Sequence, residues 1–105
     1  MNYYFDLLHS LIESVKQMNN DRSLYSNDNP DGLRSDGYAR RRCVYICRMI
    51  INKMLPLVDR TSKQKNLLDF QEDFRYVNFR NINNSNDANN DLDYIYQRLH
   101  NYIMN

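Results

Sequence analysis

Residues 38–58 read YARRRCVYICRMIINKMLPLV, the most apolar stretch of this 105-residue chain. After Cys43, three strongly polar residues interrupt it: Arg48, Asn52 and Lys53. A helix that is apolar nearly all round is normally buried on nearly all sides. The stretch therefore predicts a central helix, over residues 36–59, with other helices packed against most of its surface.

A narrow polar strip runs along this expected helix at spacings of four, three and four residues: Arg41, Tyr45, Arg48 and Asn52. Pro56 continues the strip close to the end of the helix. Because proline has no amide hydrogen, it cannot bond to the carbonyl four residues earlier, that of Asn52. We expect a kink near Pro56, or a break followed by a short turn, with the freed carbonyl facing solvent.

Three further amphipathic helices are expected around the central one. Apolar residues recur at helical spacing over residues 3–18, 62–79 and 87–104, although a short extended segment after Phe74 is an alternative. Residues 19–35 contain Asn-Pro and Asp-Gly pairs without apolar periodicity, which is typical of a loop, either packed or flexible. The predicted fold is an all-α bundle of about four helices with the second buried at its centre.

The composition is typical of one soluble domain spanning residues 1–105. A net charge of +1 predicts no strong bulk attraction to nucleic acid or to acidic membranes. No apolar run approaches the ~18 residues that a membrane span requires. The N-terminal residues lack the basic segment of a signal peptide. We therefore expect an intracellular protein without a membrane partner.

The residue usage is skewed, with 16 Asn, 9 Tyr and 11 Asp but only 2 Glu. Asparagine and tyrosine have AT-rich codons, yet the 10 arginines outnumber the 4 lysines. This composition resembles that of small proteins of large DNA viruses, particularly those of insects. No motif carries the resemblance, so no family is assigned. A viral protein of this kind would act in the cytoplasm or nucleus of its host.

Two cysteines, Cys43 and Cys47, lie four residues apart on one side of the expected helix. That geometry is poor for a disulfide between them, so we expect buried free thiols. Zinc held by these cysteines together with His9 and His100 is the alternative, although the two histidines lie in different predicted helices. We predict neither a metal site nor a cofactor.

No residue pattern supports catalysis. The chain has no G-x-S-x-G elbow and no cysteine beside a base. Its only glycines, Gly32 and Gly37, cannot form a phosphate-binding loop. His9 is expected on the surface of the first helix. We therefore predict no catalytic residues and no enzymatic activity.

The run Arg40-Arg41-Arg42 is the most distinctive charged feature. If the helix starts near residue 36, these cations oppose the helix dipole and lose ~0.3–1 kcal/mol each. They are either neutralised inside the fold, by Asp31, Asp36 or carboxylates of another helix, or they bind a partner. Arginine side chains match the oxygen atoms of carboxylates and phosphates, so either chemistry suits a partner.

Tyrosines could extend such a binding surface. Five of them lie at the edges of the predicted apolar stripes, either exposed to a partner or at the rim of the core: Tyr3, Tyr38, Tyr45, Tyr76 and Tyr94. We expect a non-enzymatic interaction or assembly protein that binds a protein partner or its own copy. The residues expected to bind are Arg40, Arg41, Arg42, Tyr45 and Arg48. The alternative is a small nucleic-acid-binding protein that uses the same arginines, together with Lys53, on phosphates.

Overall fold

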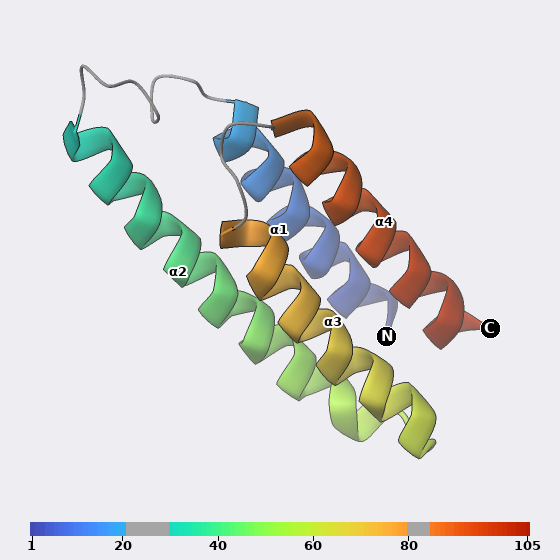
Figure 1. Cartoon of the computed structure of the whole chain (residues 1–105). Helices are drawn as coiled ribbons and strands as arrows, with labels where there is room; N and C mark the ends of the chain where they lie inside the picture. Colours follow the sequence, from blue (N-terminus) through green and yellow to red (C-terminus); the bar gives the residue numbers. More distant parts are fainter. Residues whose placement is uncertain (21–29, 80–84) are drawn as a thin grey trace.

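The structure, a computed structural model, describes residues 1–20, 30–79 and 85–105. Four α-helices and one short 3₁₀ helix make up this part of the chain: α1 (Asn2–Asn20), α2 (Pro30–Met54), η2 (Leu55–Leu57), α3 (Thr61–Phe79) and α4 (Ser85–Met104). Each α-helix runs antiparallel to the next along the chain (Figure 1). The expected all-α bundle of four helices is confirmed.

The helices pack in a closed ring rather than around a central one. Helix α1 packs against α2 and α4, and α3 packs against the same two helices (Figure 1). Each helix contributes one apolar stripe to a shared core. The fully buried side chains of this core include Phe5, Leu8, Ile12, Val15, Cys47, Ile51, Met54, Leu67, Phe74 and Leu92.

Helix α2 buries one face only, which corrects the expectation of a helix covered on nearly all sides. The polar strip through Arg41, Tyr45, Arg48 and Asn52 is exposed, as expected. Met49, however, is exposed as well, because it lies beside this strip and away from α1 and α3. An apolar side chain need not be buried, since much of any folded surface is apolar.

The chain around Pro56 does not show a kink; it has the other expected arrangement, a break of the α-helix followed by a short turn. Helix α2 ends at Met54, and Pro56 lies in the first turn of η2, which follows directly. The amide of Val58 then donates to the carbonyl of Leu55 at 3.3 Å. Proline has no amide hydrogen to donate to the carbonyl of Asn52, as a continuing α-helix would require. In the first turn of a 3₁₀ helix an amide has no helical partner, so Pro56 leaves no hydrogen bond of η2 unmade.

Helix α2 starts earlier than expected, at Pro30 instead of near residue 36. Proline is favoured in the first turn because its amide would have no helical partner there. Helices α1, α3 and α4 agree with their predicted ranges to within two residues at each end. The predicted loop 19–35 is shorter than expected, since residues 19–20 belong to α1 and residues 30–35 belong to α2. The rest of it, residues 21–29, lies outside the described part of the chain. No helix in the described ranges is long and apolar enough to cross a membrane.

Candidate functional site

The three consecutive arginines of α2 have different surroundings. Arg40 is only 3% exposed and lies on the inward face of α2, in line with Cys43 and Cys47. Arg41 and Arg42 are exposed. Because the helix starts at Pro30, all three lie in its fourth turn, beyond the first turn in which the helix dipole acts. The three arginines therefore do not oppose the helix dipole, contrary to the expectation from the sequence.

Arg40 forms the centre of a buried polar cluster between three helices. Its Nη2 donates to Oδ1 of Asn19 in α1 at 2.6 Å. Its Nη1 donates to the carbonyl oxygen of Asn78 in α3 at 2.8 Å and to Oδ1 of the same residue at 3.3 Å. Nδ2 of Asn78 donates back to the carbonyl of Arg40 at 2.8 Å. Buried charges are tolerated when they are hydrogen-bonded in this way.

The cluster continues into the fourth helix. Nδ2 of Asn19 donates to Oδ1 of Asn89 in α4, and Nδ2 of Asn89 donates to Oδ1 of Asn20, both at 2.9 Å. Burial lowers the pKa of the Arg40 guanidinium, and the nearby Cys43 acts in the opposite direction. Arg40 thus links all four helices from inside the bundle and is not part of the surface on which a partner would bind. The sequence analysis missed Asn19, Asn78 and Asn89.

The other predicted binding residues lie together on the outer side of α2. Tyr38, Arg41, Arg42 and Tyr45 line a shallow hollow of about 420 Å³. Tyr38 is 76% exposed and Tyr45 is 61% exposed. Arg48 is exposed one turn beyond Tyr45. We call these five residues the α2 outer surface.

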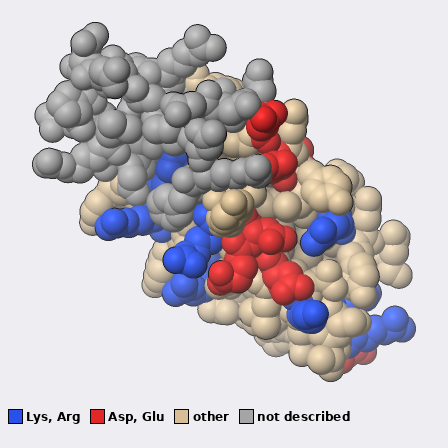
Figure 2. Space-filling model, viewed as in Figure 1, with Lys and Arg blue, Asp and Glu red and all other residues tan. Residues whose placement is uncertain are grey.

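The α2 outer surface is basic and carries no carboxylate of its own, since residues 37–58 contain neither Asp nor Glu. Figure 2 shows Lys and Arg side chains over α2, whereas over α3 and α4 the Asp and Glu side chains lie among further Lys and Arg side chains. Arg41, Arg42 and Arg48 form no ion pair with any side chain that the structure describes. The side chains of Asp31 and Asp36, named above as possible counter-charges, lie outside that part.

The tyrosines expected at the edges of the apolar stripes are exposed. Besides the two on α2, the rings of Tyr3, Tyr76 and Tyr94 are each more than 60% accessible. Tyrosine combines a large apolar ring with a hydroxyl group, which is why it is enriched at protein interfaces. The surface therefore presents large aromatic side chains on three sides of the bundle.

The cysteines are buried free thiols, as expected. Burial raises the pKa of Cys47 to about 12, and Cys43 contributes in the same direction. Such a thiol is protonated and unreactive at neutral pH. The rings of His9 and His100 each lie near the ring of Tyr96 between α1 and α4. Among the side chains that the structure describes, no three from His, Cys, Asp or Glu lie close enough together to hold a metal ion.

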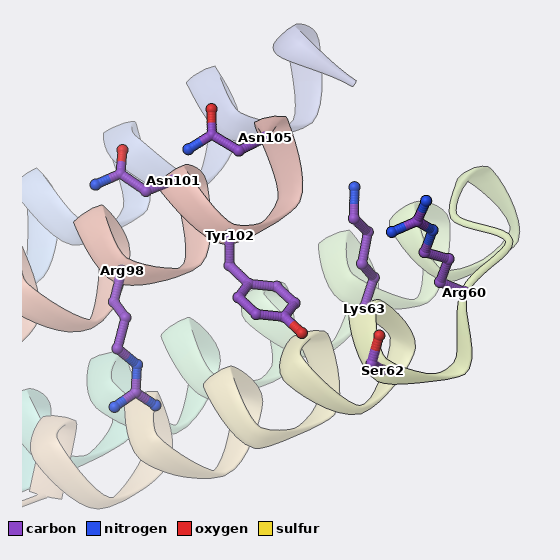
Figure 3. A pocket seen from close by; sticks show the side chains of 7 residues that line it. All are labelled: Arg60, Ser62, Lys63, Arg98, Asn101, Tyr102 and Asn105. Atoms are coloured by element: carbon purple, nitrogen blue, oxygen red, sulfur yellow. The ribbon is translucent and has the colours of Figure 1, made fainter.

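A second hollow, of about 550 Å³, lies where α3 begins and α4 ends (Figure 3). Three cations line it together with four uncharged residues: Arg60, Lys63 and Arg98, with Ser62, Asn101, Tyr102 and Asn105. Two of the cations already interact within the fold. Lys63 Nζ donates to the carbonyl of Ile103 at 3.0 Å, which satisfies the end of α4, and Arg98 lies 3.8 Å from Asp73. Two of the three cations that line the hollow are thus engaged within the fold.

No known protein-family model matches this chain, and neither a curated protein nor a solved structure matches it.

Proposed function

We propose that this chain is a non-enzymatic interaction protein that binds an acidic surface of a protein partner through the α2 outer surface. The observation that carries the proposal is the set of three exposed arginines, Arg41, Arg42 and Arg48, which have no counter-charge in the described part of the chain. Exposed arginine and tyrosine side chains on one helix face are the residue types that most often dominate binding energy at protein interfaces.

A protein partner is favoured over nucleic acid by three features. Arg40 is buried, so the surface has fewer cations than the sequence suggests. The net charge of the whole chain is only +1, which gives little of the long-range attraction that nucleic-acid binding relies on. Tyr38 and Tyr45, on either side of Arg41 and Arg42 along the helix, add apolar contact area that a folded protein surface can cover.

The test is charge reversal on the outer surface. The variant carries Arg41→Glu, Arg42→Glu and Arg48→Glu, and a matched control carries Arg60→Glu, Lys65→Glu and Arg75→Glu on other exposed cations. We expect the first variant to lose the proteins that co-purify with the wild-type chain, a differently tagged copy of the chain included, while the control keeps them. Thermal melting followed by circular dichroism checks that both variants fold.

Retention of every partner by the folded α2 variant would refute the proposal. Binding of mixed-sequence DNA or RNA by the wild-type chain, lost in the same variant and weakening steeply with salt, would also refute it in favour of the nucleic-acid alternative.

A further inference from the structure

The hollow of the α2 outer surface has the layout of a hole in helix–helix packing. The four residues that line it, Tyr38, Arg41, Arg42 and Tyr45, occupy positions i, i+3, i+4 and i+7 of one helix. Residues at these spacings are neighbours on the surface of a helix, so their side chains surround a single gap. In coiled coils, each such gap receives one side chain of the facing helix. With a volume of about 420 Å³, the hollow has room for a large apolar side chain.

A second group of four residues repeats this layout further along α2. Its members have the same spacing, and all of them are exposed: Tyr45, Arg48, Met49 and Asn52. Because each residue of an α-helix is turned by about 100° from the one before it, Tyr38, Tyr45 and Met49 form a line along the outer side of α2. Helices α1 and α3, which pack against α2, lie on its opposite side (Figure 1). The two groups therefore form one continuous face, which no helix in the described part of the chain covers.

Cations flank this line on both sides. By the same rotation, Arg41 and Arg48 lie on one flank, and Arg42 and Lys53 lie on the other. None of these four cations forms an ion pair with a side chain that the structure describes. In helix pairs, the charges on the flanks determine which partner is accepted. Two copies of the chain joined through this face would place like charges opposite each other, which is unfavourable. The matching helix therefore carries carboxylates on its flanks.

We propose that the α2 outer surface binds an acidic amphipathic α-helix of a partner protein, which packs along α2 and places a large apolar side chain in the hollow. This inference rests on the proposed function, because it specifies the acidic surface that α2 recognises. Recognition of an amphipathic helix through its apolar side recurs among protein complexes. The spacing of the residues around the hollow supplies the shape for such a helix, and the flanking cations supply the charge.

The experiment measures the binding of synthetic peptides about four heptads long, which is enough for an isolated helix to form. The acidic peptide has leucine at the a and d positions and glutamate at the e and g positions, and its like-charged flanks keep it from pairing with itself. A shuffled peptide has the same composition without the heptad order, and a basic peptide has lysine in place of glutamate. Fluorescence anisotropy of the labelled peptides measures Kd. We expect the full wild-type chain to bind the acidic peptide at least about tenfold more tightly than either of the others.

A first variant tests the packing and leaves every cation in place. Tyr45→Ala together with Met49→Ala removes walls of both groups, so we expect it to bind the acidic peptide at least about tenfold more weakly than the wild type. Tyr94→Ala together with Met104→Ala is the matched control, because the same two residue types are exposed on α4. The control should bind like the wild type.

A second variant tests the charge. The chain with Arg41→Glu, Arg42→Glu and Arg48→Glu should lose the acidic peptide and bind the basic peptide instead, since the charges on both sides of the contact are then exchanged. All side chains replaced in these variants are exposed, and circular dichroism checks that each variant folds.

Binding of the acidic and shuffled peptides with equal affinity, or of neither, would overturn the inference. A folded Tyr45→Ala, Met49→Ala chain that binds the acidic peptide like the wild type would overturn it too. Dimers of the wild type in sedimentation velocity that this variant loses would overturn it in favour of a second copy.

The failure of the inference is distinguishable from that of the proposed function. Equal binding of the acidic and shuffled peptides, both lost in the charge-reversed chain, would refute the helix and leave an acidic partner standing. A charge-reversed chain that keeps every natural partner would refute the proposed function itself and the inference with it.

Discussion

Replacing Asn78 with leucine tests whether the buried cluster around Arg40 stabilises the bundle. The side chain of Asn78 is fully buried, and leucine has a similar size, so Asn78→Leu removes polar contacts with little change in packing. One lost bond comes from the Arg40 guanidinium, and hydrogen bonds to charged groups contribute about 1.5–3 kcal/mol. The other runs from Nδ2 to the carbonyl of Arg40, and a neutral bond contributes about 0.5–1.5 kcal/mol.

The first of these bonds is long, at 3.3 Å, and Nη1 keeps its bond to the carbonyl of residue 78, so its contribution lies at the low end. We therefore expect Asn78→Leu to lower the free energy of unfolding by about 2–3 kcal/mol. Urea denaturation followed by circular dichroism measures this value, provided that unfolding is two-state. Each kcal/mol should also lower Tm by roughly 4–8 °C in a domain of this size.

Asn66→Leu is the matched control, because Asn66 lies in the same helix and its side chain bonds only to the exposed carbonyl of Ser62. Its effect should stay within about 0.5 kcal/mol, as is usual for surface positions. A double-mutant cycle of Arg40→Met with Asn78→Leu should then show a coupling of at least about 0.5 kcal/mol, since the two residues are in contact. An Asn78→Leu chain as stable as the Asn66→Leu chain would refute the reasoning.

Three further predictions concern pH and the core. Burial raises the pKa of Cys47 to about 12 from its ordinary 9.0, so the stabilisation by the neutral thiol is full below pH 9.0 and is lost as pH rises toward 12. Urea titrations at a series of alkaline pH values should therefore show a smaller loss of stability with pH for Cys47→Ala than for the wild type. The hydrogen bond to Asp93 is the main cause that raises the pKa of Lys16, and burial opposes it. The stabilisation by protonated Lys16 is therefore full below pH 10.5 and is lost as pH rises through the raised pKa. Lys16→Met should remove this pH dependence of the free energy of unfolding. Phe74→Ala should lower the free energy of unfolding by about 3–5 kcal/mol because Phe74 is fully buried. Leu68→Ala, at a half-exposed site, should lower it far less, and calorimetry measures both variants.

The fold was predictable because the apolar periodicity of each helix is local information. In α1, for example, the stripe of Leu8, Leu11 and Val15 is buried as its spacing predicts. The burial of α2 was overestimated because hydrophobicity alone does not tell which apolar residues face a neighbour. Met49 continues an apolar run, but its angular position places it outside, and that position depends on how α1 and α3 pack.

The buried cluster was not predictable from the sequence because its members are distant along the chain. Arg40 is 21 residues from Asn19 and 38 residues from Asn78. Each asparagine, taken alone, resembles the many others in this chain, and asparagine near a helix end normally indicates a cap or a turn. One local signal existed, since Arg40 has the same helical register as Cys43 and Cys47, which were expected to be buried.

The helix geometry also explains why the three arginines could not act as one site. Successive residues of an α-helix are turned by about 100°, so three in a row span about 200° of its circumference. A helix that packs on one side cannot expose all of that arc, and in α2 the inward part falls on Arg40. The arginines of α2 that a partner can reach are therefore Arg41, Arg42 and Arg48. No acidic side chain in the described bundle forms an ion pair with them, so these three cations are the ones that a partner would meet.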